Sequence, residues 1–287
     1  MSDNKRVVAG VLFRVFSVFF AVVPCSWGGT RPPTPTRMAL SESIGHGMLS
    51  FPLEKGRLHT RIAPGYSTID MNGSKMSGWA MTGSANYGLS DHWGIGFMAG
   101  HNDLKGKSPI SVGSGVVPPN TLSYESVNGH DSNGQGTVVM GNFVWDHWTG
   151  DGFRLPVYMG AGFISITETR EDSTLGVRNG GELTGGALAL GAAPSWGFRN
   201  FRAAVYVMTI MCLGQGTEYV EGYKSPAANR NKYSGPGLGD SDSILLPLGT
   251  ELTYMPWGLS FGYVAPIDGA STYTLSWTRR WGSTASN

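Results

Sequence analysis

The sequence has little charge, only two cysteines and no long apolar run. Charged residues make up 14% of the 287 residues, against about 25% in an average composition. The formal net charge of +1 gives no long-range field for a polyanion, so no nucleic-acid partner is expected. No run reaches the roughly 18 apolar residues of a membrane-spanning helix, which excludes a helical membrane protein.

Glycine and aromatic residues are abundant instead. The chain contains 43 glycines, about twice the usual share, and aromatic residues make up 11%. So many aromatic side chains with so little charge exclude a disordered chain, and the absence of glycine at every third position excludes collagen. Glycine breaks helices, which disfavours a helical bundle. These observations leave a glycine- and aromatic-rich all-β protein.

The first 28 residues have the pattern of a secretory signal peptide. Lys5 and Arg6 precede an apolar region, residues 7–23, that is interrupted by one arginine. A basic head before an apolar core of about 7–15 residues is typical of export signals. We therefore predict export, with cleavage near the end of residues 1–28.

The segment that follows, residues 29–56, is a proline- and glycine-rich linker without hydrophobic periodicity. Sequence leaves open whether it is a short periplasmic tail or a plug inside a barrel. Pro24 disfavours acylation of Cys25, and loss of the signal would leave Cys212 as the only cysteine, so no intrachain disulfide is expected.

From residue 57 onward, apolar and small residues alternate with period two. In residues 77–89, for example, Trp79, Met81 and Tyr87 lie on one face, and glycine, serine and threonine dominate the other. A soluble sandwich would bury aliphatic residues and expose charges on the opposite face. Here the opposite face is small and almost uncharged, which suits a narrow barrel interior, so the aromatic face must point into lipid.

Ten such segments predict an antiparallel transmembrane β-barrel over residues 57–281, with a short tail at 282–287. The expected strands are 57–70, 77–89, 93–103, 135–146, 154–169, 184–196, 200–213, 243–255, 257–265 and 271–281. Short connections alternate with long ones near 104–134, 170–183 and 214–242. Short periplasmic turns and long extracellular loops are typical of outer-membrane barrels. An open sheet edge is costly in lipid, so the first strand must pair with the last.

Tryptophan supports the same orientation. Seven of the nine tryptophans lie near the ends of the strands at the short turns, where the indole N–H can reach water. This predicted membrane-interface girdle comprises Trp93, Trp145, Trp148, Trp196, Trp257, Trp277 and Trp281.

Several segments resemble bacterial outer-membrane β-barrel proteins in the style of OmpA and OmpW. The strand-turn-strand at residues 87–97, the alternation at 156–163 and the aromatic terminal strand carry this resemblance. It implies the fold, a location in the bacterial outer membrane, and the lipid bilayer and outer-membrane assembly machinery as partners. Arg279 departs from the pattern because it interrupts the outward aromatic row of the terminal strand.

One short motif resembles a catalytic segment. The run His130-Asp131-Ser132-Asn133-Gly134 resembles part of outer-membrane phospholipase A. The resemblance implies His130 as general base, Ser132 as nucleophile and Asn142 as the orienting residue. Strand parity, however, turns His130 and Ser132 away from lipid, and an accidental match in a polar outer loop is the alternative. Omptin-type proteases share the strand count, but they need an Asp-x-His triplet, which this sequence lacks.

Strand parity also directs four charged side chains into the barrel: Arg154, Arg202, Glu251 and Arg280. They could form an anion-favouring constriction, or an ion-paired plug such as Arg202 with Glu251. No metal cluster or cofactor motif is present, so neither a metal nor a cofactor is expected.

The sequence thus predicts a non-catalytic structural barrel or a narrow small-solute pore. Two alternatives stay open: an acyl hydrolase that uses His130 and Ser132, and a surface adhesin or receptor that binds ligands through the long loops.

Overall fold

The computed structural model describes most of the chain from residue 53 onward, together with two earlier residues. The described positions are 36, 39, 53–71, 74–117, 121–148, 152–172, 177–222, 229–233, 244–245, 247–266 and 270–282. The predicted signal peptide and the C-terminal tail beyond Gly282 lie outside them. None of the described helical residues belongs to a helix long and apolar enough to cross a membrane.

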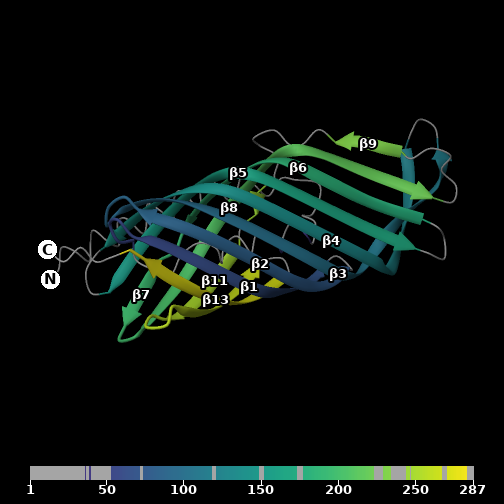
Figure 1. Cartoon of the computed structure of the whole chain (residues 1–287). Coiled ribbons are helices and arrows are strands. Elements are labelled where there is room, and N and C mark those ends of the chain that lie inside the picture. Colours follow the sequence, from purple (N-terminus) through teal and green to yellow (C-terminus); the bar gives the residue numbers. More distant parts are fainter. Residues whose placement is uncertain are drawn as a thin grey trace, which may run out of the picture.

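Ten strands form a closed antiparallel barrel (Figure 1). In pairing order around the wall they are β1 (Leu58–Met71), β2 (Ser74–Gly88), β3 (Trp93–Val117), β4 (Thr121–Trp148), β5 (Phe153–Asp172), β6 (Val177–Ala192), β8 (Phe201–Gly222), β11 (Pro247–Tyr254), β12 (Leu259–Pro266) and β13 (Ala270–Trp281). Closure runs from the pair Leu58 and Trp281 to the pair Ile69 and Ala270. The predicted pairing of the first strand with the last is therefore confirmed, and no strand of this ring is left with an open edge to lipid.

Three short strands extend this wall. The short strand β7 (Ser195–Phe198) follows β6 after Pro194, and like β6 it pairs with β5 and β8. Pro194 has no N–H for the ladder, which interrupts β6 at this point. The strands β9 (Asn229–Tyr233) and β10 (Ile244–Leu245) both pair with β8 toward the opposite end of the barrel.

Alternation places the large apolar residues outside, as predicted. Phe97 on β3 and Phe261 on β12 are 50% and 56% exposed, and Leu275 on β13 is 54% exposed. Their strand neighbours Met98 and Ser276 are buried inside the wall. An exterior of exposed aromatic and aliphatic side chains is stable only against hydrocarbon.

One set of connections is tight. Residues Leu89 to His92 link β2 and β3, and Ser90 Oγ accepts hydrogen bonds from the backbone N–H groups of His92 (3.2 Å) and Trp93 (3.0 Å). The turn between β11 and β12 uses Gly258 at φ 64°, a backbone conformation that favours glycine. These turns define the periplasmic end of the barrel.

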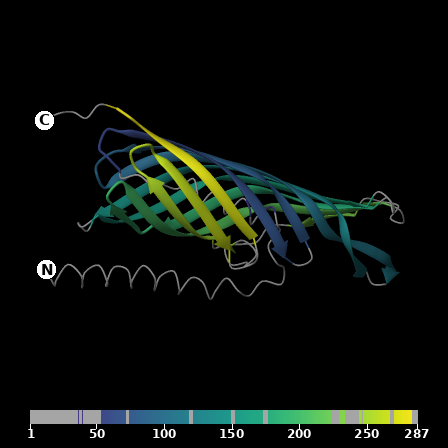
Figure 2. The ribbon, with the colours of Figure 1, turned by 90° about the horizontal axis from the view of Figure 1, so that it is seen from below.

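At the other end, the long loops are shorter than predicted. Most of residues 104–134 belong to β3 and β4, whose pairing continues to Val117 and Thr121. Likewise β5 and β6 reach Asp172 and Val177, and β8 reaches Gly222. Figure 2 shows the wall of β3 to β6 and β8 reaching beyond the yellow strands β11 to β13. Many of the residues expected in loops therefore belong to paired strands, because backbone pairing continues where the apolar alternation stops.

The interior is not lined by small residues alone, which corrects the sequence interpretation. Strands β3, β4, β5 and β8 point large apolar side chains inward, and several are less than 2% exposed: Met98, Met140, Tyr158, Met208 and Ile210. The facing strands carry hydroxyl groups, as in the 2.7 Å hydrogen bond between Ser67 and Thr272. The lumen therefore has an apolar half and a hydroxyl-bearing half.

Candidate functional site in the barrel lumen

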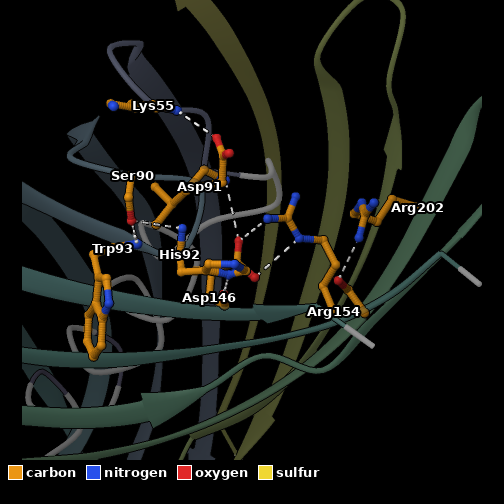
Figure 3. Close-up of polar contacts among 10 residues, drawn as sticks. Lys55, Ser90, Asp91, His92, Trp93, Asp146, Arg154 and Arg202 are labelled. Atoms are coloured by element: carbon orange, nitrogen blue, oxygen red, sulfur yellow. Dashed lines mark hydrogen bonds and ion pairs between the residues drawn. The ribbon is translucent and has the colours of Figure 1, made fainter. Parts of the chain in front are cut away.

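A buried ion pair links adjacent strands at the periplasmic end of the lumen. Arg154 of β5 donates from Nε to Asp146 Oδ1 (3.2 Å) and from Nη2 to Asp146 Oδ2. The two side chains are only 4% and 2% exposed. A two-point contact between guanidinium and carboxylate fixes both planes (Figure 3). Both residues point inward because they share the parity of the buried face of their strands.

A second ion pair crosses the lumen. Arg61 of β1 donates from Nη1 to Glu251 Oε1 (3.1 Å) and from Nη2 to Oε2 of β11. Strands β12 and β13 separate β1 from β11 in the wall, so the contact spans the interior. Thr253 donates to Glu251 Oε1 (3.1 Å) and shares a 2.8 Å hydrogen bond with Ser260. The carboxylate is thus held from two sides.

The remaining predicted lumen charges lie differently. Arg202 is half-buried and donates to Ser195 Oγ (3.0 Å), and among the described residues it forms no ion pair. Glu251 pairs with Arg61 in place of the expected Arg202. Arg280 lies at the exposed periplasmic rim and pairs with Glu54 (3.2 Å). Arg61 and Asp146 were missed from the sequence, although strand parity alone would have placed both inside.

The chain preceding β1 completes this end of the lumen. Leu53 is 1% exposed, and its backbone N–H donates to Asp146 Oδ2 (3.3 Å). Lys55 N donates to Asp91 Oδ1 (3.1 Å) in the turn before β3, and His92 Nδ1 lies 3.0 Å from the Asp146 carbonyl oxygen (Figure 3). Asp146 therefore joins β5, the β2–β3 turn and the N-terminal segment.

The three residues of the hydrolase hypothesis are not brought together. Ser132 is 3% exposed on the inward face of β4, and its Oγ lies 3.7 Å from Met76 Sδ. Asn142 donates to Asn86 Oδ1 (2.7 Å). Ten residues along one strand separate Ser132 from Asn142 by about 33 Å, so Asn142 cannot orient His130. His130 is half-buried and lies opposite Ser108 in the ladder, within β4 and not in a loop.

The tryptophans of the predicted girdle lie at or near the strand ends that the tight turns join. Most of its side chains are 43% to 71% exposed: Trp93, Trp196, Trp257, Trp277 and Trp281. Trp145 is partly covered and packs 6.1 Å from Trp93, measured between ring centroids. The backbone of Trp148 ends β4, and its side chain lies outside the described set.

A second aromatic row, missed from the sequence, lies at the outer border. Tyr66 is paired with Trp79 on one side and Tyr273 on the other, and Tyr263 lies 5.0 Å from Tyr273 between ring centroids. Beyond this row the outward face becomes charged, with exposed pairs such as Lys107 and Asp131. Two aromatic borders around an apolar band mark the two faces of a bilayer.

Within the described part of the chain, no group of three or more His, Cys, Asp or Glu residues could hold a metal ion.

No protein-family model matches the chain. No curated protein matches it either.

Solved structures show similarities of general architecture. The outer membrane protease OmpT from Escherichia coli has 11% identity, covers 81% of this chain and 99% of its own, with a TM-score of 0.46. The transport unit of the autotransporter AIDA-I from Escherichia coli has 12% identity, coverage of 86% and 96%, and a TM-score of 0.44. The outer membrane protein OprG from Pseudomonas aeruginosa has 12% identity, coverage of 81% and 99%, and a TM-score of 0.37.

The class of the protein follows from its own geometry. A closed antiparallel wall of ten strands, an apolar exterior, two aromatic borders and tight turns at one end define a bacterial outer-membrane β-barrel. The protein spans the outer membrane, and the lipid bilayer is its partner.

Proposed function

We propose that the protein is a structural, non-catalytic outer-membrane barrel whose lumen is closed to solutes. The main support for this proposal is the Arg61–Glu251 ion pair, which crosses the interior with side-chain exposures of only 3% and 4%. The pair formed by Arg154 and Asp146 lies at the same end of the lumen and is equally buried. Water and small solutes have no access to side chains that are buried in this way.

Packing above the ion pairs supports closure. Tyr158, Met140 and Met208 are each 1% exposed, and Ile210 is 0% exposed. A water-filled channel would leave its lining accessible and polar. Close packing of inward methionine, tyrosine and isoleucine side chains is the arrangement of a protein core.

The contacts of the hydrolase residues support the absence of catalysis. A serine nucleophile needs a base within about 2.6–3.2 Å and a group that orients that base. Ser132 instead contacts Met76. Asn142 contacts Asn86, and it lies about 33 Å from Ser132 along β4. Both residues face the interior, away from membrane phospholipids.

Conductance in planar bilayers tests the closed barrel. The full chain should give no single-channel steps, whereas Arg61→Gln combined with Glu251→Gln should give narrow steps because the crossing contact is weakened without leaving a buried charge. The matched control is Lys107→Gln combined with Asp131→Asn, an exposed ion pair outside the lumen, which should stay silent. Regular steps from the parent protein would refute the closed barrel.

A second candidate function is surface binding by the extended hairpin of β3 and β4. These strands have 25 and 28 residues, far more than the about 9–11 that cross a bilayer. Outward charge begins at Asp103 and continues with Lys105 and Lys107, so the rest of the hairpin projects into water. Ser108 and His130 face each other in the ladder, so a two-residue turn joining them would remove the hairpin tip cleanly. Loss of cell-surface or phage binding in this variant, with the barrel still folded, supports the candidate; unchanged binding refutes it.

A further inference from the structure

The chain before β1 enters the barrel at its periplasmic end. Leu53 fits against Gly94 near the start of β3, where a Cβ would lie 2.9 Å from Leu53 Cδ2. Gly88 at the end of β2 makes the same kind of room, because a Cβ there would overlap the carbonyl oxygen of Glu54. Lys55 forms a parallel bridge with Gly88. The wall is therefore shaped around this part of the N-terminal segment.

The same segment occupies the lumen again at the outer end. Thr36 N donates to Glu168 Oε1 on β5 (2.7 Å), and the Thr36 carbonyl oxygen accepts from Asn102 Nδ2 on β3 (3.1 Å). On β4, between these two strands, a Cβ at Gly134 would overlap Thr36 Oγ1. Thr36 is buried, and so are Asn102, Gly134 and Glu168 around it. Three adjacent strands, β3, β4 and β5, thus contact the single residue Thr36 of the segment.

Ala39 shows that this contact continues along the segment. It is 0% exposed and forms an apolar cluster with Ile69, Met76 and Leu104, which face inward from β1, β2 and β3. Thr36 and Ala39 therefore contact five strands of the wall between them.

The two contact levels give the segment a direction. Leu53 lies at the level of Gly94 and Thr36 at the level of Asn102, eight positions apart on β3, or about 26 Å along the strand. The roughly 17 residue steps from Leu53 back to Thr36 cover that distance even at the ~1.5 Å rise of a helix. Just beyond Asn102, the outward residues Lys105 and Lys107 are exposed charges, so Thr36 lies at the outer border of the bilayer.

We propose that the N-terminal segment threads the lumen from the periplasmic end to the outer end, so that the sequence preceding Thr36 is displayed at the cell surface. This inference goes beyond the closed barrel: it assigns the barrel a second task, to carry a peptide outward. Pro32, Pro33 and Pro35 lie directly before the outer contact, and proline favours an extended backbone over a tight return into the lumen.

An epitope tag between Gly29 and Thr30 of the full chain tests the display. In intact cells, an antibody should bind this tag as it binds a tag inserted between Val117 and Thr121, the last pair of the β3–β4 ladder. A tag after Arg199, in the turn between β7 and β8, should bind only after the outer membrane is permeabilised. Detection of the N-terminal tag only after permeabilisation or denaturation, or its loss from the mature chain on a denaturing blot, would overturn the proposal.

A cysteine at position 36 tests the threading independently. In a background with Cys25→Ser and Cys212→Ser, Thr36→Cys should resist a membrane-impermeant maleimide while the barrel is folded. Adding Gly134→Val should displace the segment and raise labelling at least tenfold. Gly141→Val is the matched control on the same strand, because its side chain points outward and nothing but the Ala161 carbonyl oxygen lies within 4.0 Å. Rapid labelling of Thr36→Cys without Gly134→Val would overturn the threading.

Discussion

Arg61 and Glu251 form a buried ion pair across the barrel interior, although β1 and β11 are not neighbours in the wall. The contact ties two strands that are three steps apart in the ring together at the periplasmic end. Hydrogen bonds between neighbouring strands close the wall, whereas this pair crosses the lumen inside it. The two partners come from residues 190 positions apart, so the lumen is sealed only once the whole ring has formed.

Removing one partner of this pair should be costly. Arg61→Ala leaves the Glu251 carboxylate buried without its guanidinium, which should lower the free energy of unfolding by about 3–5 kcal/mol. Urea unfolding in detergent or lipid vesicles measures the change. The control Lys107→Ala removes one partner of an exposed pair and should cost no more than about 1 kcal/mol. Equal losses in the two variants would show that the crossing pair is not buried.

The Arg61 and Glu251 substitutions should also be strongly coupled. In a double-mutant cycle, Glu251→Ala added to Arg61→Ala should cost much less than it does alone, because the second change removes the orphaned charge. We expect a coupling of about 2 kcal/mol or more. Additive losses would contradict a direct contact between the two side chains.

Lysine on the outward face of β3 should destabilise the barrel according to depth. Phe97→Lys places a charge in the apolar band and should cost about 2–4 kcal/mol, whereas Asp103→Lys at the outer aromatic border, opposite Trp79, should cost at most about 1 kcal/mol. Both residues share one face of one strand, so the comparison isolates the lipid. Similar costs at both positions would mean that this face does not meet hydrocarbon.

Ser132→Ala should leave the protein's behaviour toward phospholipid unchanged. We expect no hydrolysis by the parent or the variant in detergent with calcium, since Ser132 lies against Met76 inside the wall. Ser165→Ala, on the outward face of β5, is the matched serine control. Activity in the parent that persists in Ser165→Ala and disappears in Ser132→Ala would establish the hydrolase instead.

Most of the fold could be predicted from the sequence because period-two alternation is a local signal. The strand containing Phe97 and the strand containing Phe261 are each defined by their own residues. The outer halves of β3 and β4 were missed because outside lipid both faces of a strand can be polar, while the backbone ladder continues unchanged. Alternation in the sequence therefore marks the part of a strand that lies in the bilayer, and not the whole strand.

The interior was harder to predict. Parity identified Arg154 and Glu251 as inward and places Asp146 and Arg61 inward as well, yet the pairing of Arg61 with Glu251 depends on how ten strands close, which no local pattern contains. Met98 and Met140 face each other across β3 and β4 and fill the lumen. Their positions follow from parity as well, but the expectation of a lumen lined by small residues obscured them.

The outward orientation of the aromatic face can be measured directly with a nitroxide probe. Spin labels at Phe97→Cys, Phe261→Cys and, as an aqueous reference, Lys107→Cys can be compared in vesicles for collisions with oxygen, which concentrates in lipid, and with a water-soluble nickel complex. We expect high oxygen and low nickel accessibility at positions 97 and 261, with the opposite at position 107. Low accessibility to both reagents at positions 97 and 261 would place these residues in a dry protein centre and contradict the outward orientation.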